Sequence, residues 1–213
     1  MNLEKLILEL DVESFNGVTN VKVDGIQYDS RKIQSNNIFV AIDGFKVDGH
    51  DYIENALDNG AIAVILEKDV NINSNVAIIK VKDTRKALAK LSSAFYDNPS
   101  RKIELIGVTG TNGKTSVTYI IDSILRASNK KTGIIGTVGT YVDGIHINTK
   151  NTTPESLELQ QIFSQLVKAG THSCVMEVSS HSLNLSRVDY CDFKVEIKKS
   201  EEAFKKRVLS NKL

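Results

Sequence analysis

The hydrophobic residues of the first hundred positions follow two alternating patterns. Short runs of almost continuous apolar and β-branched residues predict buried strands at 36–42, 61–67 and 76–81. Apolar residues at helical spacing predict helices at 1–10, 49–60 and 83–99. The segment 20–33 predicts two strands joined by a hairpin turn at Asp24-Gly25. Together these elements indicate a compact α/β unit over residues 1–100.

The same alternation continues after the stretch "DNPSRK", which is the predicted domain boundary. Apolar runs predict strands at 103–109, 131–139, 140–148 and 172–181, the last of them running into a polar loop. Helical patterns are found at 114–128 and 153–170. Because strands alternate with helices of this length, we predict a second α/β domain whose parallel strands are joined by crossover helices.

Composition and charge exclude several classes of protein. Hydrophobic residues make up 41% of the chain, and the formal net charge of +1 provides no field that would attract nucleic acid. No apolar run approaches the roughly 18 residues of a transmembrane helix, so we expect no membrane insertion. Cys174 and Cys191 lack CxxC spacing and are expected to be reduced thiols of a cytoplasmic protein.

The stretch "GVTGTNGKTSVTYI", residues 107–120, joins a predicted strand to a predicted helix. Glycines let backbone N–H groups approach an anion, and the helix N-terminus adds partial positive charge. Lys114 would reach the β- and γ-phosphates of ATP, and Thr115 would offer its hydroxyl to Mg²⁺. The strict GxxxxGK[ST] pattern requires glycine where this chain has Val108. A tight turn with an incidental lysine is the alternative.

Four linked motifs identify a family. The phosphate-loop stretch is similar to the ATP loop of the Mur ligase family, which has this variant spacing. The stretch "YDSRKIQSNNIFVAIDGFKVDGHDYIENALDNGA" resembles that family's N-terminal domain, and "NTTPESLEL" and "VMEVSSHSLNLSRV" resemble its central domain. The pair of central motifs is typical of the members that add the third amino acid, diaminopimelate or lysine, to UDP-N-acetylmuramoyl-L-Ala-D-Glu. The resemblance implies an ATP-dependent ligase of peptidoglycan synthesis that acts through an acyl phosphate.

The resemblance also implies a role for individual residues. Lys114 and Glu177 would be catalytic, and Glu177 would hold Mg²⁺ together with Thr115. The ATP phosphates would lie against Gly110, Thr111, Asn112, Gly113, Lys114, Thr115 and Ser116. The UDP-N-acetylmuramoyl-dipeptide would be bound by Tyr28, Ser30, Asn151, Thr152, Thr153, Ser179 and Arg187. The sequence leaves the oligomeric state open, and a monomer is expected.

Simpler interpretations exist for some of these residues. Glu177 is alternatively a solvated loop carboxylate, and Thr153 is alternatively a helix cap, a role compatible with substrate binding. His181 follows two serines and precedes Asp189, but the absence of a GxSxG elbow argues against a nucleophilic triad. The other histidines, which show no ligand spacing, are expected at the surface: His50, His146 and His172.

The resemblance ends at Phe193. Residues 194–213, which include "KKSEEAFKKR", match nothing expected of the family and predict a solvated, aberrant charged tail. The expected domains are therefore an N-terminal UDP-sugar-binding domain at 1–100 and a truncated P-loop ATP-binding domain at 101–193, without the family's C-terminal domain. We expect such a chain to be marginally stable and to lack ligase turnover on its own.

Two other functions stay open at this point. One is a non-catalytic protein that retains the nucleotide-sugar site and ATP binding. The other is a P-loop NTPase of unrelated role, against which the paired "NTTPES" and "MEVSSH" stretches argue.

Overall fold

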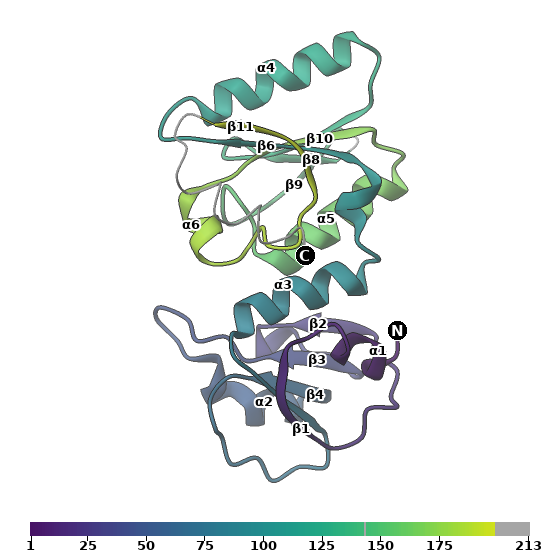
Figure 1. Ribbon diagram of the computed structural model, residues 1–213, viewed down its shortest axis with the longest axis vertical. Helices are drawn as coiled ribbons and strands as arrows, with labels where there is room; N and C mark the ends of the chain where they lie inside the picture. The colour runs from purple at the N-terminus through teal and green to yellow at the C-terminus, as the bar shows by residue number, and fades with distance from the viewer. Residues whose placement is uncertain (143, 199–213) are drawn as a thin grey trace. The chain divides into compact units, whose positions relative to one another are not determined.

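The computed structural model describes residues 1–142 and 144–198. Their contacts divide the chain between Phe95 and Tyr96, a few residues before the boundary expected from the sequence. Each of the two units is built around its own β-sheet with helices against it (Figure 1). The α/β fold class predicted from the alternating patterns is therefore confirmed.

The first unit contains a five-stranded sheet with the strand order β1-β5-β4-β3-β2. Strands β2 to β5 are parallel to one another, and β1 pairs antiparallel with β5 at the edge of the sheet. The elements are α1 Leu3–Ile7, β1 Val12–Asn16, β2 Gly25–Gln27, η1 Ser30–Lys32, β3 Asn37–Val40, η2 Gly49–Tyr52, α2 Ile53–Asp58, β4 Ala61–Leu66, β5 Ala77–Val81 and α3 Thr84–Phe95.

The predicted hairpin at Asp24-Gly25 is wrong. Strand β2 pairs parallel with β3, and Ile26 lies opposite Ile38 in that ladder. Ile26 is buried, so the parallel pairing removes an apolar side chain from water. Just upstream, Lys22 forms an isolated antiparallel bridge with Asn2. Strand β1 was not predicted, because its sequence contains no continuous apolar run. Four of its five residues are exposed.

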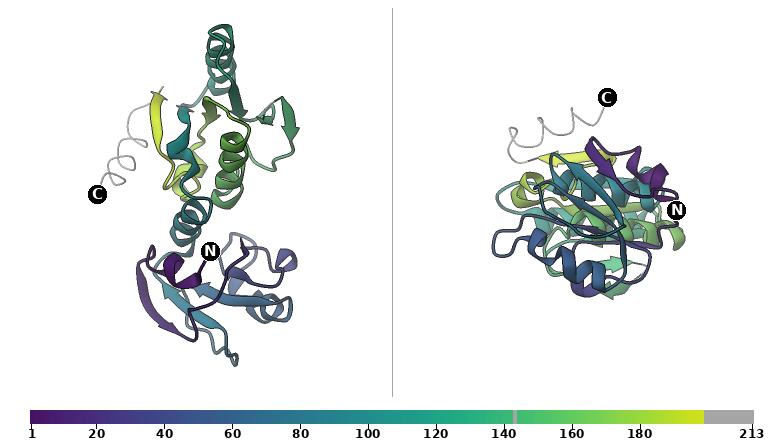
Figure 2. Two further views of the ribbon diagram at one scale, coloured as in Figure 1. Left: turned by 90° about the vertical axis from the view of Figure 1, so that its right-hand side faces the viewer. Right: turned by 90° about the horizontal axis from the view of Figure 1, so that it is seen from below.

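The second unit contains a six-stranded sheet with the order β11-β6-β10-β7-β8-β9, in which β11, β6, β10 and β7 are parallel. The yellow strand at one edge in Figure 2 is β11. The elements are η3 Pro99–Lys102, β6 Glu104–Thr109, α4 Lys114–Ala127, β7 Thr132–Ile135, β8 Thr140–Val142, β9 Ile145–Ile147, α5 Ser156–Lys168, β10 Ser173–Glu177, α6 Ser180–Asn184 and β11 Phe193–Lys198.

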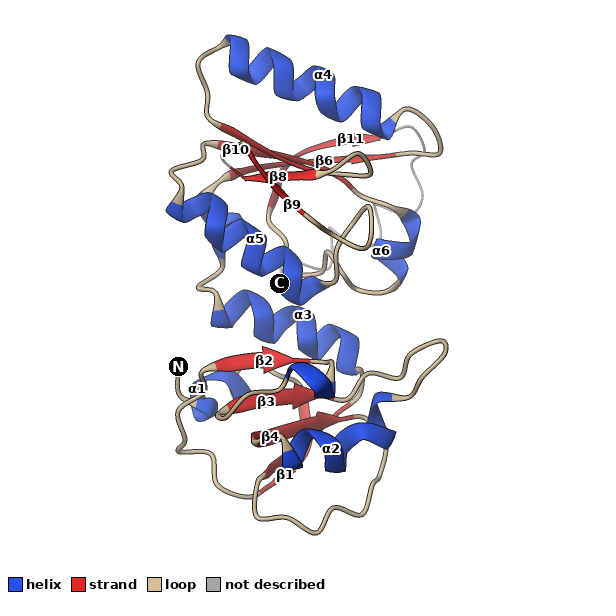
Figure 3. Ribbon diagram, turned by 180° about the vertical axis from the view of Figure 1, so that it is seen from behind, coloured by secondary structure: helices blue, strands red, loops and turns tan. Residues whose placement is uncertain are grey.

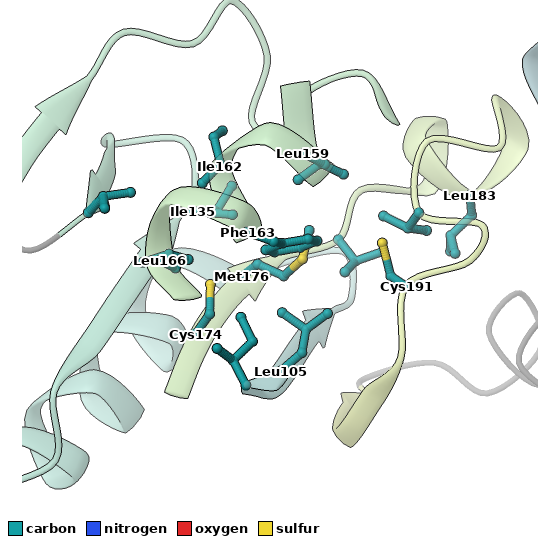
Figure 4. Packing of buried hydrophobic residues seen from close by; sticks show 14 residues of the cluster. Leu105, Ile135, Leu159, Ile162, Phe163, Leu166, Cys174, Met176, Leu183 and Cys191 are labelled. Atoms are coloured by element: carbon teal, nitrogen blue, oxygen red, sulfur yellow. The ribbon is translucent and has the colours of Figure 1, made fainter. Parts of the chain in front are cut away.

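Helices cover both faces of this second sheet, with α4 on one face and α5 on the other (Figure 3). Side chains of a strand alternate between the faces, so neighbouring residues enter different cores. On the α5 face, Phe163 is fully buried among Leu105, Met176 and Cys174 (Figure 4). On the α4 face, Val175 packs with apolar residues of β6 and α4. Burial of this kind supplies most of the stability of an α/β domain.

The far end of the chain departs from the predicted layout. Residues 194–198, which the sequence placed in the charged tail, belong to strand β11 and pair with β6. The remainder of that tail, 199–213, lies outside the described residues. So does Asp143, where the Asp143-Gly144 dipeptide within 140–148 predicts a hairpin turn. None of the helices in the described part of the chain is long and apolar enough to cross a bilayer.

Candidate functional site

The phosphate-loop stretch forms the strand–loop–helix unit that its sequence predicts. Strand β6 ends at Thr109, and α4 begins at Lys114. Gly110 and Gly113 have φ angles of 143° and 81°, which side chains other than glycine rarely tolerate. The Lys114 ammonium donates to the carbonyl oxygen of Gly110 at 2.8 Å. The loop therefore presents a helix N-terminus and a cation on one side, as phosphate binding requires.

Glu177 is the last residue of β10, the strand beside β6. It is only 1% exposed, which rules out the solvated carboxylate considered above. Alternation along β10 puts Glu177 on the same face as Val175, the face that α4 covers. Burial raises the pKa of Tyr119 on α4, and the nearby charge of Glu177 adds to this effect. The carboxylate thus lies at the carboxyl edge of the sheet and on the face of the phosphate-loop helix.

A two-residue segment after β7 holds the carboxylate of Glu177. The backbone N–H of Thr137 donates to Oε1 at 3.0 Å, and the Thr137 hydroxyl donates to Oε2 at 3.2 Å. Gly136 leaves the space for this contact, because a Cβ there would lie 2.4 Å from Oε1. Both oxygens of Glu177 consequently have a fixed direction.

The "NTTPES" segment lies against the same strand end. The Thr153 hydroxyl donates to the backbone oxygen of Glu177 at 2.9 Å and accepts from the Ser179 N–H at 3.2 Å. The Thr152 hydroxyl is 3.0 Å from the hydroxyl of Thr137. Asn151 is exposed on the same segment. Thr153 does not cap α5, whose N-cap residue is Glu155, so the cap alternative is wrong.

Arg187 closes this group of residues. Its Nη2 lies 2.6 Å from Oε1 of Glu155, and its Nη1 donates to the carbonyl oxygen of Thr153 at 3.1 Å. Within the described residues, the buried Nε has no hydrogen-bond partner. Ser179 has a second role as the N-cap of α6, where its hydroxyl accepts from the Ser182 N–H at 3.1 Å.

The remaining predicted substrate residues, Tyr28 and Ser30, belong to the first unit. Ser30 is buried in η1, and its carbonyl oxygen accepts from the Asn59 amide at 3.0 Å. In the same unit, His50 corrects the expectation of a surface histidine. It is 7% exposed, with Nδ1 2.6 Å from Asp48 and Nε2 accepting the N–H of Glu67 at 3.2 Å.

Comparison with known proteins agrees with this geometry. Residues 22–96 match the profile of the Mur ligase family, catalytic domain, and residues 108–198 match that of the Mur ligase middle domain. The chain belongs to the Mur ligase family. The resemblance inferred from the four motifs is therefore confirmed.

Two similar curated proteins are both named UDP-N-acetylmuramoyl-L-alanyl-D-glutamate–2,6-diaminopimelate ligase. The one from Caldanaerobacter subterraneus is 50% identical over 85% of this chain and 38% of its own length. The one from Alkaliphilus metalliredigens is 45% identical over 92% of this chain and 40% of its own length. The chain thus spans about 40% of the length of these relatives.

Solved Mur ligases share the fold. A structure of the diaminopimelate ligase superposes with a TM-score of 0.73 at 22% identity, covering 94% of this chain and 41% of its own. A MurF ligase from Thermotoga maritima, crystallised with ADP, gives a TM-score of 0.51 at 26% identity and covers 76% of this chain and 35% of its own.

Three residues of the site were not predicted from the sequence: Gly136, Thr137 and Glu155. Each acts through a contact with Glu177 or Arg187 that is distant in the chain. For Gly136 and Thr137 the local signal was the "GTVG" stretch after a strand, which by itself indicates a turn. Glu155 lies within the "NTTPES" motif but was given no role. Among residues 1–142 and 144–198, no three His, Cys, Asp or Glu side chains gather in a way that could hold a metal.

Proposed function

We propose that this chain supplies the ATP loop and the muramoyl-peptide site of a ligase that adds diaminopimelate or lysine to UDP-N-acetylmuramoyl-L-Ala-D-Glu. One observation carries the proposal. Glu177, at the carboxyl edge of the sheet, is bonded directly to Thr137 and Thr153 and lies on the face of α4, the helix that begins at Lys114. Ligands of parallel α/β sheets bind at this edge. The nucleotide and peptide motifs therefore share one site.

The chemistry of this ligase builds negative charge on phosphate oxygens. The terminal carboxylate of the peptide displaces ADP from the γ-phosphorus, and the incoming amine then displaces phosphate from the acyl carbon. Lys114 and the N–H groups of residues 110–116 would stabilise that charge. To do so, the Lys114 ammonium exchanges its contact with the Gly110 carbonyl for phosphate oxygens.

The residues present suit Mg²⁺. This ion prefers oxygen ligands and is commonly held by one or two carboxylates together with substrate phosphates. Glu177 offers a buried carboxylate and Thr115 a hydroxyl in the first turn of α4. With no cluster of three acidic or histidine ligands in the described residues, phosphate oxygens would complete the shell. Bound Mg²⁺ would neutralise charge on the phosphates.

The peptide end of the substrate would lie along Asn151, Thr152, Thr153 and Ser179. Arg187 would bind a phosphate or carboxylate with its charge. Tyr28 and Ser30 of the first unit would hold the uridine diphosphate end. The reaction uses ATP and a nucleotide-linked precursor, so we place the protein in the cytoplasm.

Nucleotide binding by the purified chain tests the proposal. Isothermal titration with Mg-ADP should show binding that Lys114→Ala weakens at least about tenfold, because a charge-assisted phosphate contact is lost. Lys168→Ala, an equal charge change at the exposed end of α5, is the matched control and should bind as the parent does. Equal affinities for all three proteins, or no binding by any of them, would refute the phosphate-loop assignment.

A second titration with UDP-N-acetylmuramoyl-L-Ala-D-Glu tests the peptide site. Arg187→Gln should weaken binding of the dipeptide substrate but leave Mg-ADP binding unchanged. Mass spectrometry of a reaction with ATP, Mg²⁺ and diaminopimelate then reports whether the chain alone forms the tripeptide. Absence of substrate binding to the parent chain would overturn this part of the proposal.

A further inference from the structure

We infer that Thr137 is a positioning residue that orients Glu177 as a metal ligand and links it to the peptide-binding residue Thr152. The inference rests on the proposed function, in which Glu177 binds Mg²⁺. Residues that hold a ligand from behind fix its orientation and basicity, and they contribute strongly to metal affinity.

Thr137 contacts both oxygens of one buried carboxylate. Its N–H donates to Oε1 at 3.0 Å and its hydroxyl donates to Oε2 at 3.2 Å. A single residue that engages both oxygens fixes the rotation of the carboxylate plane as well as its position. Thr137 is itself exposed, so this contact is not a consequence of core packing. Each Glu177 oxygen keeps a further lone pair for a cation.

Gly136 is required for this arrangement. A Cβ at this position would lie 2.4 Å from Oε1 and 3.1 Å from Cδ of Glu177. Any side chain would therefore push the carboxylate away from the Thr137 N–H. The turn is held by a bond from the Gly136 N–H to the carbonyl oxygen of Gly139 at 3.2 Å. Gly136 and Thr137 thus form a cradle shaped for the Glu177 side chain.

The hydroxyl of Thr137 also connects the proposed metal ligand Glu177 with the peptide-binding residue Thr152. A hydroxyl carries one hydrogen, and that of Thr137 is directed at Glu177. The contact of 3.0 Å with Thr152 therefore requires the Thr152 hydroxyl to be the donor. A substrate oxygen that takes the Thr152 hydrogen removes a bond from Thr137. Binding at the peptide site would therefore change the hydrogen bonding of Thr137, the residue that holds the Glu177 carboxylate.

Metal affinity in the presence of nucleotide tests this role. Mn²⁺, measured by electron paramagnetic resonance in saturating ADP, replaces Mg²⁺ as the probe. Thr137→Val removes the hydroxyl and keeps the shape and the N–H, so Mn²⁺ affinity should fall roughly tenfold, as for other residues behind a metal ligand. Thr137→Ser, which restores the hydroxyl, should recover most of that loss. ADP affinity without metal should be the same in all variants.

Thr149→Val is the matched control, because Thr149 forms a similar hydroxyl pair with Thr140 at 3.3 Å without contacting Glu177. It should leave Mn²⁺ affinity unchanged. Glu177→Gln separates the positioning role of Thr137 from the metal-binding role of Glu177 itself. If Glu177→Gln weakens Mn²⁺ binding and Thr137→Val does not, the role of Thr137 is refuted. If neither does, the metal role of Glu177 fails. A loss in Thr137→Val that also appears in metal-free ADP binding shows a merely structural effect and overturns the inference.

Discussion

The ion pair between Glu155 and Arg187 provides a quantitative test of how the proposed muramoyl-peptide site is held together. The two side chains are 16% and 13% exposed, and their charged atoms are 2.6 Å apart. Removing one partner of a fully buried pair costs about 3–5 kcal/mol, whereas exposed pairs contribute about 0–1 kcal/mol. Since these side chains are still slightly exposed to solvent, Glu155→Gln should destabilise the second unit by about 2–3 kcal/mol, less than for a fully buried pair.

The cost arises chiefly from the arginine that is left behind. In Glu155→Gln the guanidinium keeps the Thr153 carbonyl as a partner but loses its counter-charge, and its Nε already lacks a partner within the described residues. Arg187→Gln should also destabilise the unit. The double variant should be more stable than the sum of the two single effects predicts, by at least about 1 kcal/mol.

The assay must report on the second unit alone, since a chain with two units need not unfold in one step. Hydrogen exchange of the slowest amides of β6 and β10, measured by mass spectrometry under native conditions, gives that local free energy. Glu54→Gln, an exposed change in α2 of the first unit, is the control and should shift it by less than about 0.5 kcal/mol. Additivity of the two single variants within about 0.5 kcal/mol would refute the reasoning.

Two further predictions concern titratable groups. Burial raises the pKa of Asp48, but bonds from Lys68 and His50 outweigh that effect and leave the pKa below its ordinary value. Asp48 therefore stabilises the first unit above about pH 4 and loses this contribution as pH falls. The stability difference between the parent and Asp48→Asn should shrink from pH 7 to pH 3 in urea unfolding, and a constant difference would contradict it. Burial also raises the pKa of Cys174 and Cys191. Both thiols should resist iodoacetamide in the native protein and react once it is unfolded, as intact mass will report.

The parts of the site that could be predicted from the sequence are those whose residues are adjacent in the chain. The phosphate loop is a local strand–glycine–helix pattern, and Glu177 follows an apolar run, so the parallel arrangement of strands was enough to bring both to one edge. Thr137 was beyond reach because its bond to Glu177 joins positions 40 residues apart. That bond depends on the order of strands in the sheet, which hydrophobic periodicity does not encode.

The errors have a related origin. The Asp24-Gly25 dipeptide favours a hairpin by its turn chemistry, yet the parallel partner β3 buries Ile26 instead, and tertiary packing overrides the local signal. His50 carried no apolar context that predicted burial. It is buried because Nε2 accepts from the Glu67 N–H while Nδ1 contacts Asp48, contacts that only the folded unit brings together.

The position of β6 in the sheet has a consequence for synthesis of the chain on the ribosome. Its neighbours are β10 and β11, which among residues 1–142 and 144–198 are the last strands to be translated, whereas β3, β4 and β5 of the first unit are neighbours in both sequence and space. At about 5–20 residues per second, the apolar β6 would wait several seconds for its partners, while the first unit can already fold. Force measurements on stalled nascent chains should register an early folding event for the first unit and none for the second until β10 has emerged. During that interval we expect the apolar β6 to be exposed to chaperones.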